Sequence, residues 1–371
     1  MRVLSVVDGI GWGGTKEQVY LLARELSKRG IDIHVALSYQ YDLMVEKLSP
    51  YNVKLHFFEN HNKYARFNPL NYYRLWKIIN QFDFDVVIAN SPHTLDFVRV
   101  VFAFLRKPKR PKLIVVKRTY RKSNRLSIEL KYKYADVIVA VSEELRDLLI
   151  ESGLDKEKIR VIRSGNDLER FRPLPEEFRI AKRKQLGIDE KQIVFINVAN
   201  CIPHQKGQHI LIQAFSRLNC ENCVLLLLGH ETEKCLKLVD EEILRNTKGK
   251  IIPLGFRHDV EEFINMSDYL VVSSLFEGIA NSLVQGMACG KVCIATDCGG
   301  IANYLRDGYN GFLIKPGSVN ELVSAMQKVM KLSKDEYKSI SERAIETSKE
   351  MDINKTVDKY ISLFKELCGV E

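Results

Sequence analysis

Residues 273–300 have the sequence SSLFEGIANSLVQGMACGKVCIATDCGG, which decides the fold. This stretch includes the end of a β-rich run, DYLVVSS, after which Glu277 and Gly278 precede an apolar pattern that predicts a helix from about Asn281 to Cys289. A helix that begins directly after a strand presents unpaired N–H groups and a positive dipole end, which suit a diphosphate. The stretch therefore predicts part of a parallel α/β domain with an anion site at the start of this helix.

Strand and helix patterns alternate along the rest of the chain in two series. The first series contains the β-rich runs RVLSVVD, IDIHVALS, VKLHFF, DVVIAN and KLIVVK. The second begins with QIVFINVAN and continues with VLLLLG, KIIPLGF, DYLVVSS and KVCIATD. Such alternation predicts parallel sheets with helices between the strands. The expected fold class is α/β, with two doubly wound Rossmann-like domains.

The segment between the two series is polar, contains Pro173 and Pro175, and has no strand pattern. We therefore expect an N-terminal domain over residues 1–168, a linker over 169–190 and a C-terminal domain over 191–352. Residues 353–371 have the apolar spacing of an amphipathic helix, which must pack against another surface.

The composition is that of a soluble globular protein, with 46% hydrophobic and 28% charged residues among 371. No run approaches the roughly 20 apolar residues of a membrane-spanning helix, and the first residues do not resemble a secretory signal. All eight cysteines lie beyond residue 200 without a regular disulfide framework, and Cys220 and Cys223 form a single CxxC. We therefore expect a cytoplasmic protein with free thiols and no metal site.

Positive charge is concentrated in the first half of the chain. Residues 1–175 contain 31 Lys and Arg against 20 Asp and Glu, whereas the remaining residues contain 25 against 27. Between Arg106 and Lys133, twelve basic residues occur with a single acid, Glu129. Nucleic acid, anionic lipid head groups and a phosphorylated small substrate are all partners that fit this charge, and a solvated basic surface is the alternative.

The stretch VVDGIGWGGTKE, at residues 6–17, contains the spacing GxGxxG at Gly9, Gly11 and Gly14. A dinucleotide-binding turn needs an acid at the end of the second strand for the ribose hydroxyls, and that strand ends in SYQ. The fingerprint is therefore a weak match. A glycine turn before a helix still suits close approach of a phosphate or sugar, and this interpretation favours Gly13 and Gly14.

Two further residues accompany Glu277 in the second half. Lys206 follows the strand QIVFINVAN and its turn, which places a cation where open α/β sheets bind ligands. Gln285 lies eight residues after Glu277 and one helical turn after Asn281, so it can face the same ligand.

The chain resembles a known family. The sequence SSLFEGIANSLVQGMACGKVCIATDCGGIANYLRDGYNGFLI closely resembles the donor-site signature of the family 4 retaining glycosyltransferases, which have the two-domain GT-B fold. The blocks HQKGQHILIQAF, ADVIVAVSEELRDLLIESGLDKEKIRVIRSGNDLERF and GGTKEQVYLLARELSKRG are similar to other segments of that family. The resemblance covers nearly the whole chain.

The resemblance implies metal-independent transfer of a sugar from a nucleotide diphosphate sugar to an acceptor, with retention of the anomeric configuration and no cofactor. It implies two sheets facing a central cleft, which would be the site, and a last helix that crosses back to the first domain. Acceptor binding would fall to the first domain and donor binding to the second. A saccharide or lipid-linked acceptor would place the enzyme in polysaccharide or lipopolysaccharide biosynthesis, in the cytoplasm or at the inner face of the membrane.

The resemblance also assigns roles to residues. Lys206 would stabilise charge on the departing diphosphate, and Glu277 would hold the donor-sugar hydroxyls. The other donor-binding residues would be Gly13 and Gly14 near the sugar and diphosphate, Gly255, Phe256 and Arg257 at the nucleobase, Gly278, Ile279 and Ala280 beside the sugar, Asn281, Ser282 and Leu283 at the diphosphate, and Gln285 at the ribose.

This sequence departs from the family pattern at several of these places. Gln285 stands where the family usually has a second glutamate, and an amide accepts a hydrogen bond more weakly than a carboxylate. In the family an arginine usually stands a few residues before the lysine, and this sequence has Asn200 and Cys201 in that neighbourhood. His204 or Arg257 is then left to supply a second cation.

Acceptor-binding candidates lie in the basic first half. The strand KLIVVK ends in Lys117 and is followed by Arg118 and Arg121, which suit a phosphate on the acceptor. His93 suits an acceptor hydroxyl. The run HNKYARFNPLNYYRLWK at residues 61–77 interleaves basic and aromatic residues, which suits a saccharide or an anionic membrane surface.

Other functions are also compatible with the sequence. A nucleotide-sugar epimerase with the GT-B fold would use a similar site, and the basic half is compatible with a nucleic-acid- or membrane-binding protein without transferase activity. The sequence has no recognised nucleic-acid-binding module, so no nucleic acid is expected as a partner.

Overall fold

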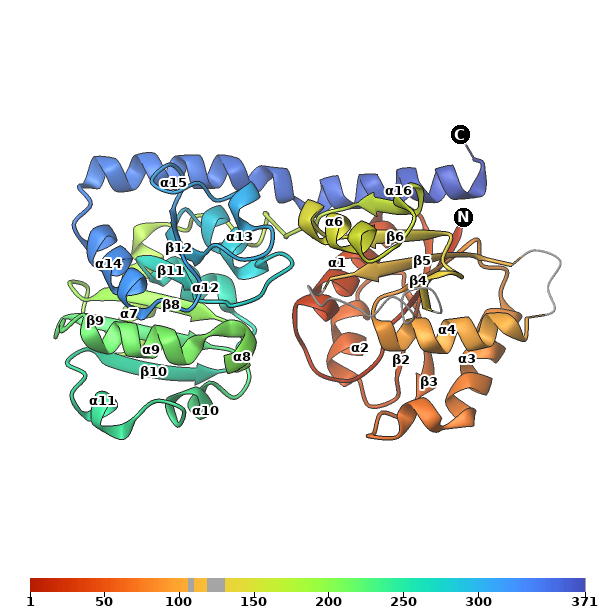
Figure 1. Cartoon of the computed structure of the whole chain (residues 1–371), viewed down its shortest axis with the longest axis horizontal. Coiled ribbons are helices and arrows are strands. Elements are labelled where there is room, and N and C mark those ends of the chain that lie inside the picture. The colour runs from red at the N-terminus through yellow and green to blue at the C-terminus, as the bar shows by residue number, and fades with distance from the viewer. Residues whose placement is uncertain (106–109, 119–130, 371) are drawn as a thin grey trace. The chain divides into compact units, whose positions relative to one another are not determined.

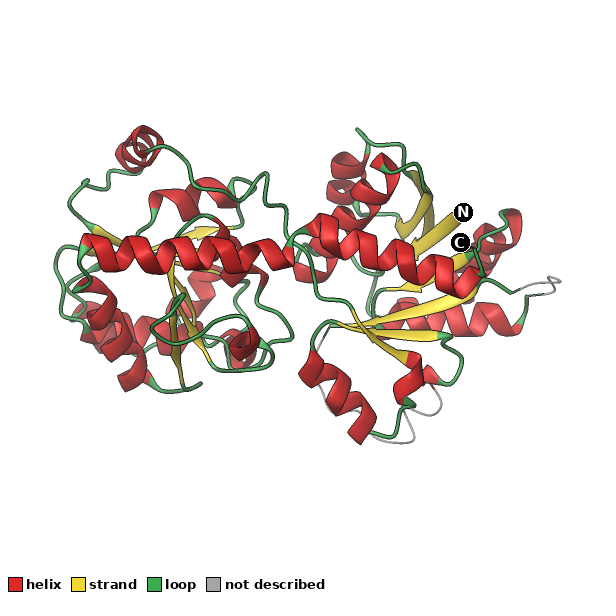
Figure 2. Ribbon diagram, turned by 90° about the horizontal axis from the view of Figure 1, so that it is seen from above, coloured by secondary structure: helices red, strands yellow, loops and turns green. Residues whose placement is uncertain are grey.

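The computed structural model describes residues 1–105, 110–118 and 131–370, which form two compact units (Figure 1). Unit 1 comprises Met1–Gly165 and Ile353–Glu371, and unit 2 comprises Asn166–Asp352. In each unit the helices cover both faces of a central sheet (Figure 2).

Unit 1 contains a parallel sheet in the order β3-β2-β1-β4-β5-β6-β7. Its inner strands are mostly apolar and buried on both faces, as expected for a sheet covered by two helix layers, whereas its two edge strands are partly exposed. The strands are β1 (Arg2–Val6), β2 (Asp32–Ser38), β3 (Lys54–Glu59), β4 (Val86–Ala89), β5 (Lys112–Lys117), β6 (Val137–Ala140) and β7 (Ile159–Val161). The helices are α1 (Gly14–Lys28), α2 (Asp42–Leu48), η1 (Ala65–Phe67), α3 (Pro69–Gln81), α4 (Pro92–Ala103), α6 (Glu143–Glu151), η2 (Lys156–Lys158) and α16 (Ile353–Cys368).

Unit 2 contains a parallel sheet in the order β10-β9-β8-β11-β12-β13. The strands are β8 (Ile193–Val198), β9 (Cys223–Leu228), β10 (Lys250–Gly255), β11 (Tyr269–Val272), β12 (Val292–Thr296) and β13 (Phe312–Ile314). The helices are α7 (Glu176–Gln185), α8 (Pro203–Lys206), α9 (Gln208–Arg217), α10 (Thr232–Leu236), α11 (Glu241–Arg245), α12 (Val260–Met266), α13 (Asn281–Ala288), η3 (Ile301–Asn303), α14 (Val319–Met330), α15 (Lys334–Ser348) and η4 (Lys349–Met351). The prediction of two doubly wound parallel α/β domains is confirmed.

Each sheet has a point where the strand order reverses. The reversal falls between β1 and β4 in unit 1 and between β8 and β11 in unit 2. In open α/β sheets, ligands bind beside the carboxyl ends of the strands at this switch point. The loops after these four strands are therefore where a site is expected.

The segment at residues 169–190 is part of unit 2, which differs from the linker expected there. Phe171 and Ile188 are buried in the core of that unit. The fully buried Arg183 donates to the backbone oxygens of Met266, Glu190 and Gln192 and to Asp268. The polar, proline-containing sequence did not indicate this packing, because one of the residues that anchor the segment, Arg183, is charged.

The C-terminal helix α16 packs in unit 1. Its buried residues include Val357, Tyr360 and Phe364, which follow the expected apolar spacing. Arg29, just after α1, donates to Asp358 of α16 at 2.7 Å.

Two disulfides correct the expectation of free thiols throughout the chain. Cys201 pairs with Cys235, and Cys220 pairs with Cys223. Cys201 follows β8 and Cys235 lies in α10 after β9, so the pairing of neighbouring strands brings them within 6.0 Å between Cα atoms. Spacing along the sequence gave no sign of this. The four other cysteines, at positions 289, 293, 298 and 368, are free.

Residues 1–105, 110–118 and 131–370 include neither a membrane-spanning helix nor a cluster of metal-ligating side chains. No helix in these ranges is long and apolar enough to cross a bilayer. The same ranges contain no cluster of three or more His, Cys, Asp or Glu residues arranged to hold a metal ion.

Candidate functional site

Lys206 and Glu277 form an ion pair at the switch point of unit 2. Lys206 ends the short helix α8 after β8, Glu277 lies in the loop after β11, and these two strands are paired neighbours. The Nζ atom of Lys206 donates to Oε1 of Glu277 at 2.5 Å. The side chain of Glu277 is 8% exposed and that of Lys206 is 22% exposed. A cation and a carboxylate thus meet, partly buried, at the expected edge of the sheet.

The two loops that carry this pair are fastened to each other. The Ser273 hydroxyl donates to the backbone oxygen of Lys206 at 2.9 Å. The backbone N–H of Leu275 donates to the backbone oxygen of Gln205 at 2.7 Å. Gly207 has a φ of +62°, and a Cβ there would lie 2.2 Å from the backbone oxygen of Ser273. Only glycine permits this approach.

Glu277 is held from two further sides. The Ser274 hydroxyl donates to Oε1 of Glu277 at 2.7 Å. Gly299, in the loop after β12, has a φ of +59°, and a Cβ there would lie 1.9 Å from the backbone oxygen of Glu277. The carboxylate is therefore oriented by its surroundings before any ligand binds.

Several backbone amides between Glu277 and α13 lack partners. Within the described residues, no hydrogen bond is made by the N–H groups of Gly278, Ile279, Asn281 and Ser282. The Oδ1 atom of Asn281 is also buried without a partner. The start of this eight-residue helix thus combines free donors with the positive end of the helix dipole.

Two amides expected to be free are not. The N–H of Ala280 donates to the Tyr304 hydroxyl at 3.2 Å, and that of Leu283 donates to the backbone oxygen of Ala280 at 3.0 Å. The Leu283 side chain is fully buried in the core. The helix begins with a tight turn, which engages Leu283, and Tyr304 comes from a loop that the local pattern does not reveal.

Gln285 lies one helical turn after Asn281 and is half-buried. Its side-chain amide makes no hydrogen bond within the part of the chain that the structure describes. The amide is therefore available to a ligand held at the helix start.

The end of β10 and the loop after it contain the three residues expected at a nucleobase. Gly255 has a φ of +67°. The Phe256 ring stacks on His230 with a centroid distance of 4.4 Å and an angle of 12°. Arg257 makes two hydrogen bonds to Asp259, both at 3.0 Å. His230 was not predicted, since it follows a different strand, β9.

His204 and Arg257, the residues expected to supply a second cation near Lys206, lie in different surroundings. Arg257 is engaged by Asp259, and His204 is exposed on α8. Asn200, where the family usually has arginine nearby, accepts from the backbone N–H of His230 at 3.0 Å, and Cys201 is in a disulfide.

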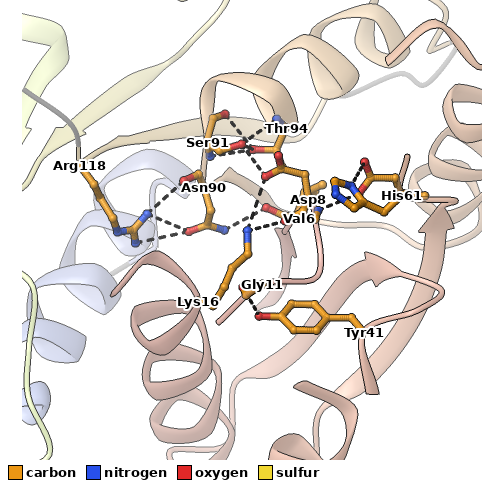
Figure 3. A network of polar contacts seen from close by, with 12 residues as sticks. Val6, Asp8, Gly11, Lys16, Tyr41, His61, Asn90, Ser91, Thr94 and Arg118 are labelled. Carbon is orange, nitrogen blue, oxygen red and sulfur yellow. Dashed lines mark hydrogen bonds and ion pairs between the residues drawn. The ribbon is translucent and has the colours of Figure 1, made fainter. Parts of the chain in front are cut away.

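Unit 1 has a polar network at its own switch point (Figure 3). The Asn90 side chain, after β4, donates to the backbone oxygen of Val6 in β1 at 3.1 Å. The Arg118 guanidinium, after β5, is directed at Asn90 and contacts its two oxygens at 3.3–3.5 Å. The Nε atom of Arg118 is buried without a partner. Lys16 donates to the backbone oxygen of Asp8.

The other acceptor candidates lie in different surroundings. His93 is exposed in the first turn of α4, whereas Lys117 is buried in β5. Arg121 lies outside the described residues. Asn90, which the sequence did not suggest as a site residue, is the side chain that Arg118 approaches.

Gly13 and Gly14 stand at the start of α1. Gly13 precedes the helix in an extended conformation, without a side-chain cap, and Gly14 is the first helical residue. The helix start therefore presents backbone N–H groups beside the polar network.

The two parallel-sheet Rossmann-like units define the chain as a protein of the GT-B fold class. Residues 178–347 match the family described as glycosyl transferases group 1, and residues 12–170 match glycosyltransferase family 4. The chain belongs to the family 4 glycosyltransferases.

Among curated relatives is the N,N'-diacetylbacillosaminyl-diphospho-undecaprenol alpha-1,3-N-acetylgalactosaminyltransferase of Campylobacter jejuni. It is 28% identical over 64% of this chain and 62% of its own length. The Escherichia coli UDP-Gal:alpha-D-GlcNAc-diphosphoundecaprenol alpha-1,3-galactosyltransferase is 25% identical over 69% of this chain and 68% of its own. The chain therefore spans less than two thirds of the length of the first relative and slightly more than two thirds of the length of the second.

A solved structure is similar over the full chain. Anabaena HepE in complex with UDP and glucose superposes with a TM-score of 0.84 and 20% identity, covering 99% of this chain and 100% of that one. This likeness shows the fold.

Proposed function

We propose that this chain transfers a sugar from a nucleotide diphosphate sugar to a hydroxyl group of an acceptor, with retention of the anomeric configuration. The bond from the anomeric carbon to the diphosphate breaks and a bond to the acceptor oxygen forms. The products are the glycosylated acceptor, a nucleoside diphosphate and a proton. The observation that carries the proposal is the Lys206–Glu277 pair beside the free amides at the start of α13.

Unit 2 is the proposed donor-binding unit. Lys206 supplies positive charge where the diphosphate departs, and a preorganised charge in a partly buried site contributes several kcal/mol, roughly 3, to such a step. The free amides of Asn281 and Ser282 bind the diphosphate, and those of Gly278 and Ile279 lie beside the sugar. Ala280 and Leu283 shape this turn rather than donate.

Glu277 binds hydroxyl groups of the donor sugar in this proposal. Lys206 and Ser274 both donate to its Oε1 atom, and no described residue donates to Oε2. A carboxylate oxygen in that position accepts hydrogen bonds from sugar hydroxyls. Lys206 is the positive charge on which the proposal relies at the departing diphosphate.

The nucleobase is proposed to lie at Gly255 and Phe256, with Gln285 at the ribose. The Phe256–His230 stack offers an aromatic surface to a base at this loop. Arg257 contributes through Asp259 to the shape of the loop. Because HepE was solved with UDP, and the Escherichia coli relative is named for UDP-Gal, UDP-sugars are the first donors to test.

Unit 1 is the proposed acceptor-binding unit. Arg118 and His93, with Lys117 and Arg121, would meet an acceptor, and the unpartnered Nε of Arg118 suits a phosphate oxygen. The two named relatives act on diphospho-undecaprenol substrates, which supports a lipid-linked saccharide as the acceptor and a working place at the cytoplasmic face of a membrane. Gly13 and Gly14 keep their proposed role near the donor sugar and diphosphate.

The experiment is a screen of UDP-, GDP- and ADP-sugars for nucleoside diphosphate release, with and without lipids extracted from membranes. We expect release with one nucleotide class, stimulated by a lipid acceptor and lost in Lys206→Ala. Titration calorimetry with UDP, GDP, ADP and NADH accompanies the screen. Binding of NADH alone, without sugar-nucleotide turnover, would contradict the proposal.

A further inference from the structure

An apolar and basic surface lies on η1, α3 and the end of α4. Phe67 is 79% exposed and Phe104 is 70% exposed. Tyr64, Leu70 and Tyr73 are also exposed. We call these five residues with Lys63, Arg66, Trp76 and Lys77 the aromatic–basic surface. Figure 1 shows α3 beside α4, and the two helices pack together.

The helix α3 has apolar residues on both of its faces. Leu75 and Ile79 point into unit 1 and are fully buried. Leu70 and Tyr73, spaced one turn apart, lie on the opposite, exposed face. A surface helix normally presents charged and polar residues to water, so an exposed apolar stripe indicates a partner.

Contacts within unit 1 fix this surface in place. The Trp76 Nε1–H donates to the backbone oxygen of Phe104 at 3.4 Å, and the Tyr73 and Trp76 rings stack 6.0 Å apart. The Tyr72 hydroxyl donates to the backbone oxygen of Arg66 at 2.7 Å. The exposed side chains are therefore presented by an ordered framework.

The charge of this surface is of one sign. No acidic residue occurs between Glu59 and Asp83 in the sequence. Lys63, Arg66 and Lys77 have no acidic partner within 4.0 Å among the described residues. These three cations are thus available to an anionic partner.

We propose that the aromatic–basic surface docks unit 1 on an anionic phospholipid bilayer. Tyr and Trp rings favour the head-group region, apolar side chains enter the acyl boundary, and Lys and Arg contact lipid phosphates. A second copy of this chain fits less well, because a symmetric dimer would bring the cations of each copy against those of the other. Binding to the bilayer deepens the proposed function, since it brings the chain to a lipid-linked acceptor.

The test is co-sedimentation of the full chain with vesicles, without any nucleotide sugar. We expect the protein to bind vesicles of phosphatidylcholine with 30% phosphatidylglycerol at least tenfold more tightly than phosphatidylcholine alone. The triple variant Lys63→Glu, Arg66→Glu, Lys77→Glu should lose this preference, and Phe67→Ser with Tyr73→Ser should weaken binding about tenfold.

Matched controls use unit 2. The triple variant Lys331→Glu, Lys334→Glu, Lys338→Glu changes net charge equally, and Leu238→Ser removes another exposed apolar residue. Both should bind like the unchanged protein. Because every altered side chain in the test variants is exposed or partly exposed, thermal melting should stay unchanged and exclude misfolding as the cause.

Three results would overturn the inference. The first is equal binding to both vesicle types, and the second is full binding by the charge-reversed variant. The third is a protein that does not bind vesicles but forms a dimer in sedimentation velocity, with the dimer abolished by the Phe67 and Tyr73 changes. Nucleotide release measured separately keeps the two proposals distinguishable. Vesicle binding without turnover would refute the transferase and leave the surface intact, and turnover without vesicle binding would do the reverse.

Discussion

The Nζ atom of Lys206 lies 2.5 Å from Oε1 of Glu277, although 71 positions separate the two residues in the chain. A glycine with a left-handed backbone conformation holds the backbone near each residue. Gly207 packs against Ser273 beside Lys206, and Gly299 packs against the backbone of Glu277. Both charges are therefore positioned by the fold rather than by a ligand. This arrangement is the preorganisation that electrostatic catalysis requires.

The first prediction concerns this pair. Lys206→Ala should lower kcat for sugar transfer by about 10²–10³, because it removes the charge opposite the departing diphosphate. Glu277→Ala should also abolish transfer, since the sugar hydroxyls lose their carboxylate. Steady-state nucleotide release measures both effects.

The matched control is Lys234→Ala. Lys234 is an exposed lysine of unit 2 that also pairs with a glutamate, Glu231, and its removal should leave turnover unchanged. Circular dichroism should show intact folds in all three variants. Turnover at the unchanged rate in Lys206→Ala or Glu277→Ala would place the site elsewhere.

A second prediction concerns the ribose. Gln285→Glu should tighten UDP binding by about fivefold, because a carboxylate accepts hydrogen bonds from ribose hydroxyls more strongly than an amide. Titration calorimetry gives the Kd directly. Gln327→Glu on the exposed side of α14 adds the same charge away from the site and serves as the control. An unchanged Kd in Gln285→Glu would mean that this side chain does not reach the ribose.

A third prediction concerns pH. His34 is fully buried, and its two nitrogens contact His56 Nε2 at 2.8 Å and Asp32 Oδ1 at 3.2 Å. The contacts fit two neutral rings, with His56 donating to His34 and His34 donating to Asp32. Burial lowers the pKa of His34 to about 4 from 6.5 and also lowers the pKa of His56, with nearby Lys54 acting in the same direction.

The direction in which pH changes the stability of the fold follows from proton binding. Between pH 6.5 and 4 the unfolded chain binds more protons than the folded one, so stability is complete above about pH 6.5 and is lost as pH falls toward 4. We expect a loss of about 2 kcal/mol in the free energy of unfolding, given ~1.4 kcal/mol per pKa unit and partial screening by solvent.

Tryptophan fluorescence isolates this effect, because Trp12 and Trp76 both lie in unit 1 and the chain has two tryptophans. Urea unfolding at pH 7 and pH 5 should show the loss in the unchanged protein. His34→Gln should reduce the difference between the two pH values, while His93→Gln, at an exposed site, should keep it. An equal pH dependence in His34→Gln would show that another group is responsible.

The sequence reveals the strands, the two-sheet fold and the start of α13 because these depend on local apolar periodicity and on glycine at helix starts. It does not reveal the anchor of 169–190, since Arg183 is a charged residue whose partners lie on distant segments. The disulfide between Cys201 and Cys235 depends likewise on strand neighbours.

Within the candidate site the same division holds. Lys206, Glu277 and the free amides follow from motifs, and their meeting follows from strand order. The partners Ser274, Tyr304 and His230 come from tertiary packing that no local spacing encodes.

The last prediction tests the glycine that fixes Glu277. Gly299→Ala should reduce turnover at least tenfold and lower Tm by several degrees, because a Cβ there would lie 1.9 Å from the Glu277 backbone oxygen and must displace that loop. Gly308→Ala is the matched control. Gly308 has a similar φ of +68° but nothing within 4 Å of its Cβ position, so this variant carries only the backbone strain, about 1 kcal/mol. Differential scanning calorimetry and nucleotide release on both variants separate the two effects. If both variants lose activity equally, strain rather than displacement of Glu277 is the cause, and the proposed link between Gly299 and the catalytic carboxylate fails.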